Sequence, residues 1–378
     1  MKSKVTITLC GDLCPTKDTL PNFLKEDFPS LFNDVQGVFD NSDFLFGNLE
    51  CVLTDSPTPI RKSGPVLHAP TSTVKALKKA GFNLLSLSNN HIRDCGESGV
   101  KSTIAACLDN GIATFGAGKN IYDSKKPYIK EVNGYKIGFI AFSEQEFNTA
   151  TETSYGAGFF DPLDDLDLIE DTKNNVDYLI VIYHGGAEYY EYPSPLLQKK
   201  CRKFVDKGAD LVLCQHSHCI GTFEDYAGKR ILYGQGNTVF GHREGNDQWN
   251  RGLLVQILFD GTFTPTINFV PITANDKGGI TLLTKKDTAL LLSQLSERSE
   301  KIKDKAFIYS EWEKFIAFKS KLYVPYLLGF NRLFIHLNRI TNNRFTNLFY
   351  KRSRLLTTHN IIRCESHNEV IQSILKKW

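Results

Sequence analysis

Two histidines separated by one residue follow a short apolar run near the middle of the chain. Residues 211–214 have the composition of a buried parallel strand, and His216 and His218 come directly after it. Imidazoles that leave the carboxyl end of a strand in an open α/β sheet can point into one crevice, and neutral imidazole is a common metal ligand. The pair therefore predicts a metal site, although such a pair also occurs as ordinary loop residues.

Five other predicted strands also end in side chains that suit metal binding or proton transfer. In chain order these side chains are Asp12, Asn48 with Glu50, Asn90 with His91, His184 with Glu188, and Asn237. Carboxylates, imidazoles and amides form a set of nitrogen and oxygen ligands that suits Mn, Zn, Fe or Mg rather than a thiolate site. Two such metals bridged by one carboxylate would activate a water and hold the oxygens of an in-line phosphoryl displacement.

The elements that would position these residues alternate between strands and helices. Strands are predicted over 5–10, 44–46, 84–87, 112–115, 178–183, 211–214 and 231–233, and helices over 23–39, 71–80, 97–109 and 196–207. Hairpins are predicted around Asn133-Gly134 and Asp260-Gly261. This order predicts an α/β fold, a layered sandwich of mixed sheets covered by helices.

The order of the motifs resembles the poly-gamma-glutamate capsule-synthesis (CapA-like) proteins, a branch of the calcineurin-like metallophosphoesterase superfamily. The motifs are GD, NLE, NNHxxDxG, HxGxE, HxH and GN, and the resemblance covers roughly residues 4 to 272. It implies a metallophosphoesterase-like fold. It also implies a hydrolase that serves the biosynthesis of a capsule, a polysaccharide or another surface polymer.

By position in the motifs, the resemblance also implies two divalent metal ions bridged by Glu50. The ligands would be Asp12, Glu50 and His218 for one ion, and Asn90, His184 and His216 for the other. His91 would protonate the leaving oxygen or steady the phosphoryl charge. Asp94 would fix the tautomer of His91 and Glu188 that of His184.

Other motif residues receive supporting roles, and two depart from the superfamily pattern. Asn48, Arg93 and Asn237 would contact the substrate or support the ligands. Glu50 stands where an aspartate is usual. Cys14 stands where a histidine is usual, so it is a soft ligand, a small core residue or the mark of a weak first site.

Most of these polar residues also have a purely structural interpretation. Asp12 suits a turn cap, and Asn90 and Asn237 suit plain turns. Glu188 lies among tyrosines, so it suits either a solvated rim or a wall that grips a sugar or a base. Each residue alone favours the structural interpretation, whereas the ordered set favours the metal site.

Charge divides the chain into two parts. Residues 276–378 hold 19 Lys and Arg against 9 Asp and Glu, a net charge of +10, and the rest hold 26 against 33, a net charge of −7. We expect a CapA-like metallophosphoesterase domain over 1–275 and a basic, mainly helical extension over 276–378. The chain has no predicted signal peptide, and its nine scattered cysteines favour reduced thiols in the cytoplasm.

The extension is predicted to contain amphipathic helices. One covers 281–295, and another carries an apolar stripe beside basic residues, formed by Leu333, Phe334, Leu337 and Ile340. Packing on the domain is the simplest interpretation. The alternative is peripheral contact with an anionic membrane at its inner face, or with a synthase complex. No nucleic-acid-binding module is recognisable, so no nucleic acid partner is expected.

We therefore predict a metal-dependent hydrolase that acts on the phosphoester bonds of a phosphorylated or polymeric small-molecule substrate. The alternative, from a different class of protein, is a non-catalytic accessory subunit of a membrane-associated polymer synthase. Such a subunit would keep the pocket as a binding site.

Overall fold

The chain folds into two compact units, Met1–Tyr309 and Ser310–Trp378. The computed structural model describes residues 4–16, 18–327, 329–341, 344, 346 and 352–375. The first unit extends past the boundary predicted at residue 275, because helix α10 (Lys285–Lys301) buries Leu291 and Leu295 in the core of that unit.

A mixed eight-stranded sheet carries half of the candidate site. Its order is β18-β17-β16-β1-β2-β5-β6, and β15 also pairs with β1. Its strands are β1 (Val5–Leu13), β2 (Phe44–Leu49), β5 (Leu84–Ser86), β6 (Ala113–Phe115), β15 (Asn237–Val239), β16 (Arg251–Phe259), β17 (Thr266–Ala274) and β18 (Ile280–Leu282). Because β1, β2, β5 and β6 are parallel, their carboxyl ends meet at one edge.

A six-stranded sheet carries the other half, in the order β13-β14-β12-β11-β9-β8. Its strands are β8 (Tyr128–Val132), β9 (Tyr135–Ser143), β11 (Tyr178–His184), β12 (Leu211–Gln215), β13 (Phe223–Tyr226) and β14 (Lys229–Leu232). Strands β9, β11, β12 and β14 are parallel to their neighbours in this group, and β8 pairs antiparallel to β9. Both predicted hairpins, β8–β9 and β16–β17, are therefore confirmed.

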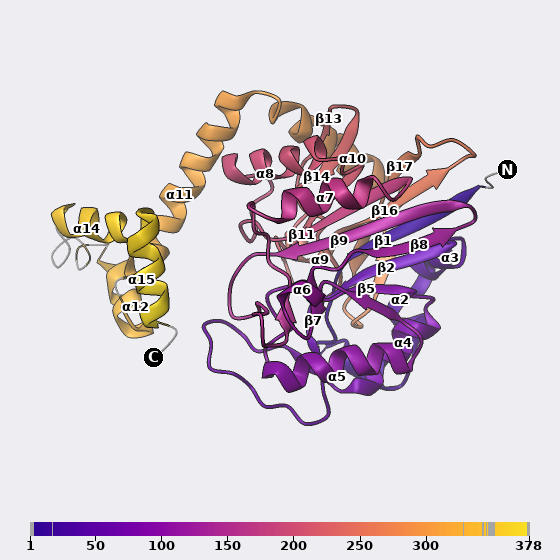
Figure 1. Cartoon of the computed structure of the whole chain (residues 1–378), viewed down its shortest axis with the longest axis horizontal. Coiled ribbons are helices and arrows are strands. Elements are labelled where there is room, and N and C mark those ends of the chain that lie inside the picture. The colour runs from indigo at the N-terminus through magenta and orange to yellow at the C-terminus, as the bar shows by residue number, and fades with distance from the viewer. Residues whose placement is uncertain are drawn as a thin grey trace. The chain divides into compact units, whose positions relative to one another are not determined.

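The two sheets pack face to face, and helices cover both outer faces (Figure 1). Along β11, Ile180 and Ile182 belong to the core between the sheets. Leu179 and Val181 point the other way and pack with α7 (Asp165–Lys173) and α8 (Pro195–Asp206). On the opposite side, α4 (Val74–Lys79) and α5 (Gly96–Asp109) cover the eight-stranded sheet (Figure 1). The predicted layered sandwich of mixed sheets is confirmed.

The helix predicted over 23–39 is interrupted in the structure. It is replaced by α1 (Leu20–Leu24), α2 (Phe28–Phe32), a 3-10 turn (Asn33–Val35) and α3 (Gln36–Asp40). Glu26 and Asn33 have φ angles of 54° and 41°, in the left-handed region that ends a helix. The apolar spacing misled because each short piece still buries its own apolar residues, such as Phe23, Phe32 and Phe39.

The helix predicted over 71–80 begins differently from the expectation. A 3-10 turn (Thr71–Thr73) precedes α4, and the Thr73 hydroxyl donates to the Pro70 carbonyl oxygen at 2.7 Å instead of capping α4. The Thr71 N–H and hydroxyl both donate to Asp55, at 2.9 and 2.5 Å. A preceding loop therefore anchors this turn.

Short elements complete the first unit. They are β3 (Val52–Leu53), β4 (His68–Ala69), β7 (Ala117–Gly118), β10 (Gly156–Ala157), α6 (Ile121–Ser124) and α9 (Asp247–Asn250). Strands β3 and β4 pair with each other and so close the loop 54–67, which lies at the site.

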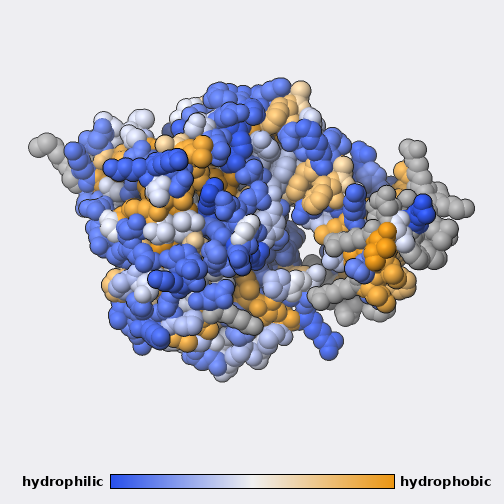
Figure 2. Space-filling model, turned by 180° about the vertical axis from the view of Figure 1, so that it is seen from behind, coloured by the Kyte–Doolittle hydropathy of each residue, from blue (hydrophilic) through white to orange (hydrophobic). Residues whose placement is uncertain are grey.

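The second unit is helical in its described residues. Helix α11 (Lys305–Leu327) enters it, and α12 (Arg332–Ile340), α14 (Arg352–Arg363) and α15 (Glu365–Leu375) follow. Much of its apolar surface is exposed (Figure 2), including 72% of Phe318 and 69% of Ile340. No helix among the described residues is long and apolar enough to span a membrane.

The apolar stripe predicted in this unit lies largely at the surface. Leu333, Phe334 and Ile340 are exposed, whereas Ile335, which was not part of the predicted stripe, is buried. Several of the basic residues predicted in this part of the chain lie outside the described residues. They are Lys351 and the side chains of Arg332, Arg339, Arg352 and Arg354.

Candidate functional site

The first half of the site comes from neighbouring strands of the eight-stranded sheet. Asp12 lies beside Asn48 of β2 on one side and Asn237 of β15 on the other. Asp12 and Asn48 therefore lie inside their strands rather than after them, because β15 pairs with β1 up to Leu13 and β2 continues to pair with β1 up to Leu49. The Asn48 amide donates to Asp12 Oδ1 at 2.8 Å.

The second half comes from the carboxyl ends of two neighbouring strands in the six-stranded sheet. His184 is the last residue of β11, and His216 and His218 follow β12. Both residues after β12 have positive φ angles, 87° for His216 and 52° for His218, which are strained for side chains of this size. The His216 N–H donates to Asp12 Oδ2 at 3.2 Å and so links the two sheets at this strained turn.

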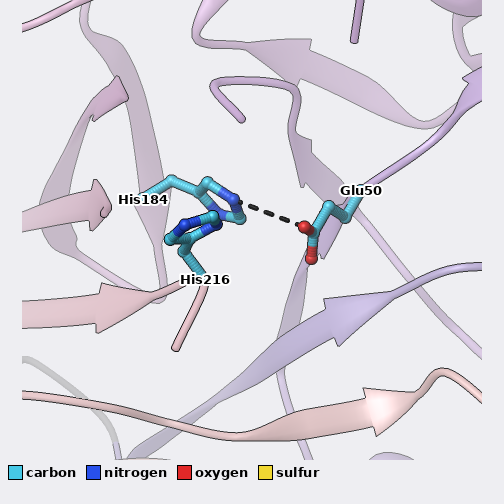
Figure 3. Close-up of side chains that lie close together, drawn as sticks. All are labelled: Glu50, His184 and His216. Atoms are coloured by element: carbon cyan, nitrogen blue, oxygen red, sulfur yellow. Dashed lines mark ion pairs between the residues drawn. The ribbon is translucent and has the colours of Figure 1, made fainter. Parts of the chain in front are cut away.

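Two groups of potential ligand atoms meet at Glu50. Within each group the atoms lie within 4.8 Å of one another, and the groups are Glu50, His184 and His216, and Asp12, Glu50 and His218. Glu50 Oε1 is 3.5 Å from His184 Nε2 and 3.8 Å from His218 Nε2. Figure 3 shows Glu50 facing His184, with His216 beside it. The structure thus brings the predicted ligands together around the predicted bridging residue.

Burial leaves the two carboxyl groups short of compensation. It raises the pKa of Asp12 to about 8, with a further increase from the charge of Glu50. Burial also raises the pKa of Glu50 to about 8, and Glu188 and Glu146 contribute to the increase. Among the described residues, no donor meets the geometry of a hydrogen bond to either oxygen of Glu50, and the nearby His91 and Asp12 offset the increase in its pKa only in part. A buried charge without a partner is costly, so this position needs a proton or a cation.

The three imidazoles at the site are held neutral. Burial lowers the pKa of His184 and of His216, and it lowers the pKa of His218 to about 3. No residue that the structure describes forms a hydrogen bond with His216 Nδ1. Neutral imidazoles offer lone pairs rather than positive charge. They therefore cannot compensate the negative charge of the two carboxylates as a cation would.

The orientation of His218 is fixed by a chain of hydrogen bonds. The Asn237 amide nitrogen donates to the Trp249 carbonyl oxygen at 2.9 Å, so the amide oxygen faces His218 Nδ1, also at 2.9 Å. That oxygen can only accept, so Nδ1 carries the proton. The lone pair on Nε2 therefore lies on the side of Glu50.

His184 lies between two amides. Its Nδ1 is 3.2 Å from the Asn48 amide nitrogen, and its Nε2 is 3.1 Å from Asn90 Oδ1. Asn90 is thereby placed next to the group with which the resemblance associates it. The predicted role of Glu188 in orienting His184 does not match these contacts, because both ring nitrogens face other residues.

Two buried carboxyl groups, of which only Asp12 accepts hydrogen bonds from described residues, form together with the neutral imidazoles a donor set that fits divalent cations. Oxygen and imidazole nitrogen are the ligands that Mn, Zn, Fe and Mg accept. A cation would compensate the two carboxylates and occupy the unpaired lone pairs. The same residues, without a cation, would leave several buried polar atoms unsatisfied.

His91 is held on one side of the site by two further residues. Its Nδ1 is 2.6 Å from Asp94 Oδ2, which is the contact predicted between them. The other oxygen of Asp94 accepts from the Lys62 ammonium at 2.6 Å, and the Lys62 side chain is only 2% exposed. Lys62 was not predicted, because it comes from the irregular loop 54–67, where no periodicity marks it.

Two other predicted residues are not members of either ligand group. Cys14 belongs to the hydrophobic core, and a hydrogen bond with Cys51, together with burial, raises the pKa of its thiol well above its usual value. These surroundings favour the core interpretation of Cys14. Arg93 donates to the Thr149 carbonyl oxygen at 3.2 Å and so supports a loop.

A cavity of about 780 Å³ opens beside the two groups. Asn90, His91 and His218 line it on the side of the ligands. Tyr189 and Trp249 line it as well, together with Arg243, which lies in the loop after β15. Trp249 and Arg243 were also not predicted, since a single aromatic residue in a one-turn helix or a single basic residue in a loop carries no spacing signal.

Comparison with known proteins places these residues in a family. Residues 6–242 match the family described as "Bacterial capsule synthesis protein PGA_cap". The chain is 29% identical over 310 residues to the capsule biosynthesis protein CapA of Bacillus anthracis, covering 79% of this chain and 74% of that protein. It is 31% identical over 216 residues to the PGA biosynthesis protein CapA of Bacillus subtilis, covering 56% of this chain and 57% of that protein.

A solved structure of a phosphatase from Mycoplasma pneumoniae aligns over 72% of this chain and 95% of that protein. The alignment has a TM-score of 0.47 and 11% identity, and we draw no functional conclusion from it. The family match alone covers more than half of the chain. The chain therefore belongs to the bacterial capsule synthesis protein family, PGA_cap.

Proposed function

We propose that the chain is a metal-dependent hydrolase that cleaves phosphoester bonds in the biosynthesis of a capsule or another cell-surface polymer. One observation carries the chemistry: Glu50 is fully buried next to imidazoles, and no residue in the described part of the chain forms a hydrogen bond with either of its oxygens. The family and the names of the two CapA relatives support the process.

Under this proposal, two divalent cations are held at Glu50. The residues that would hold them are Asp12, Glu50, Asn90, His184, His216 and His218. Bound cations would neutralise phosphoryl oxygens and lower the pKa of a water. Asn237 keeps the lone pair of His218 turned toward Glu50, and His216 and His184 present neutral nitrogens.

His91 is the group that this chain offers for proton transfer to the leaving oxygen. Asp94 holds Nδ1, so Nε2 is the nitrogen left to exchange a proton with a substrate in the cavity. Lys62 keeps Asp94 in place by binding its second oxygen. Leu67 adds a backbone N–H to Asp94 at 2.7 Å, so the loop 54–67 fixes this arrangement.

The test measures bound metal and ester hydrolysis by the full chain. Metal content is determined by mass spectrometry, and 4-nitrophenol release is followed from 4-nitrophenyl phosphate and from bis(4-nitrophenyl) phosphate with Mn, Zn, Fe or Mg. We expect metal-dependent hydrolysis that falls at least about a hundredfold in His91→Asn. His68→Asn changes an exposed histidine outside the cavity and serves as the matched control. Metal-loaded protein that cleaves neither ester would overturn the proposal.

A second candidate function rests on the second unit. Its exposed Phe318, Tyr323 and Ile340 are large apolar side chains in a basic part of the chain, which suits contact with an anionic membrane or a synthase subunit. The chain would then be a non-catalytic accessory subunit at the inner face of the membrane, with the cavity as a binding site.

The two candidates differ in measurable ways. A subunit of this kind supports polymer formation in cells when His91 is replaced by Asn, and it sediments with vesicles that contain anionic lipid. The double variant Phe318→Ser and Ile340→Ser then no longer sediments with the vesicles and no longer supports polymer formation. If that variant keeps both, the accessory function is excluded.

A further inference from the structure

One wall of the cavity carries a positively charged side chain in a fixed position. The Arg243 guanidinium carbon lies 3.2 Å from the centre of the Trp249 ring, and its Nη1 donates to the Tyr189 hydroxyl at 2.9 Å. The Arg243 residue as a whole is exposed and lines the cavity, so its guanidinium can meet a ligand there. Neither the ligand groups nor proton transfer at His91 uses this side chain.

The backbone around Arg243 is also held. Its N–H donates to Asn250 Oδ1 at 2.8 Å, and its carbonyl oxygen accepts from the Asn250 amide at 2.7 Å. A long side chain that is anchored at both ends loses little entropy when it binds a ligand. Mere coverage of the Trp249 ring would not require the hydrogen bond to Tyr189 or this double contact with Asn250.

Arg243 lies close to the ligand groups. The Trp249 ring is 4.8 Å from the His218 ring and 3.2 Å from the guanidinium, so Arg243 is no more than about 8 Å from the His218 ring centre. The charge of Arg243 also helps to lower the pKa of His218. One substrate can therefore contact Arg243 and the ligand groups at the same time.

The charges around Arg243 leave it free to bind an anion. Asp247, the first residue of α9, pairs with Arg251 at 2.8 Å. Two carboxyl side chains on the cavity lining lie on the side of the ligand groups, since Glu146 accepts from the Asn90 amide at 3.4 Å and Glu188 closely follows His184 at the end of β11. The third, Asp18, is exposed, where solvent screens its charge.

We infer that Arg243 binds a second anionic group of the substrate, a carboxylate or a second phosphate, on the alcohol part of the ester. The inference rests on the proposed hydrolysis and narrows its substrate class to esters that carry two anionic groups about one aromatic ring apart. A guanidinium with several free N–H groups binds such an anion in a defined orientation.

The kinetic test compares two esters that differ by one charge. 4-Carboxyphenyl phosphate and 4-carbamoylphenyl phosphate have nearly the same shape, so the ratio of their kcat/KM values reports the recognition of the carboxylate. We expect Arg243→Gln to lower this ratio about tenfold or more, and Arg243→Lys to lower it less. Arg251→Gln, an arginine outside this cavity, is the matched control and keeps the ratio. An unchanged ratio in Arg243→Gln overturns the inference.

A third ester, 4-(phosphonomethyl)phenyl phosphate, separates the two kinds of anion. A preference for it over the carboxylate identifies a second phosphate as the group that Arg243 binds, and the reverse preference identifies a carboxylate.

A binding test does not depend on hydrolysis. The affinities of the full chain for 4-carboxybenzylphosphonate and 4-carbamoylbenzylphosphonate are measured by titration calorimetry, with and without Arg243→Gln. If no ester is cleaved but the carboxylate still binds more tightly in an Arg243-dependent way, the hydrolase proposal fails and the anion site stands. If the two phosphonates bind equally to the unchanged protein, the anion site fails.

Discussion

The two ligand groups that meet at Glu50 are built differently. The group with His184 and His216 also has Asn90 at hand, whose oxygen is 3.1 Å from His184. Within the described residues, the group with Asp12 and His218 has three candidate ligands, since Cys14 belongs to the core. More protein ligands generally give tighter binding, so the group with His184 should retain a metal longer.

The groups also differ in how far the protein arranges them in advance. Asn237 fixes the ring of His218, and the Trp249 and Phe240 rings pack against it at 4.8 and 5.0 Å. His216, by contrast, has an Nδ1 without a partner. The group with Asp12 and His218 therefore has fewer ligands, but His218 is held in a fixed orientation. The group with His184 and His216 has more ligands, but one ring nitrogen of His216 is not satisfied by the described residues. The comparison shows that ligand number and prior arrangement need not coincide within one site.

The largest effect is expected from Glu50→Gln, which removes the carboxylate that both groups share. We expect both metals to be lost and hydrolysis to fall by at least about a thousandfold. The same change removes a buried carboxyl group whose pKa is raised by burial, so the metal-free protein should become more stable at pH 8. Metal content, hydrolysis and chemical denaturation measure these outcomes.

Glu244→Gln, at an exposed position, is the control for Glu50→Gln and should change neither metal content nor stability. If Glu50→Gln still binds two metals, Glu50 does not join the groups.

The next effect separates the two groups. His218→Ala should lose one metal and keep the other, because the group with His184, His216 and Asn90 remains complete. His216→Ala should lose the more tightly held metal, so that chelator titration of the two variants gives different release curves. Equal release curves for both variants would contradict the difference between the groups. Each histidine lies at a strained position, so circular dichroism must first show that both variants are folded.

Much of this site could be predicted from the sequence, because its ligands lie at or just beyond the carboxyl ends of strands. An apolar run that ends in a polar residue marks a strand end, and parallel strands bring such ends to one edge. This reasoning located Asp12, Glu50 and His184, as well as the histidines after β12. The loop residues Lys62 and Arg243 could not be found in this way, because tertiary contacts alone place them at the site.

The fold was predictable to a similar degree. Hairpins with Asn-Gly and Asp-Gly turns were confirmed because the turn residues determine the local backbone. The helix predicted over 23–39 was wrong because apolar spacing does not report a left-handed residue, such as Glu26, inside the segment. The strand extension at Asp12 depends on β15, which lies far away in the sequence.

A smaller effect is expected from Asn237→Ala, which removes the partner of His218 Nδ1 without removing a ligand. Residues that orient metal-bound histidines typically contribute about ten- to a hundredfold in metal affinity. We therefore expect one of the two metals to bind about tenfold more weakly and the other to be unaffected, as measured by calorimetric titration. The Asn250 side chain holds the backbone of Arg243 in the segment 240–250 and does not contact His218. Asn250→Ala therefore tests whether movement of the segment alone causes the effect. If both variants lose metal affinity equally, Asn237 has no specific role in orienting His218.

The smallest effect is a pH dependence of stability in the metal-free protein. The pKa values of Asp12 and Glu50 are raised to about 8 in the folded chain, from 3.8 and 4.5. Between about pH 6.5 and 8 the folded chain therefore holds protons that the unfolded chain has lost, and its free energy of unfolding falls as the pH rises. The histidines oppose this trend only below pH 6.5, since their folded pKa values are lowered from 6.5.

Metal should reverse this trend, because ligand groups bind cations more tightly when they are deprotonated. Urea denaturation at about pH 6.5 and pH 8, with EDTA or with Mn, measures both slopes. With EDTA the chain should be less stable at the higher pH, and with Mn it should be more stable. The variant with both Asp12→Asn and Glu50→Gln should lose both slopes, since it has no carboxyl group left to titrate at this site. Equal stability of the unchanged, chelated chain at the two pH values would show that the buried carboxyl groups are compensated by the protein itself, and the case for a cation between the two groups would fail.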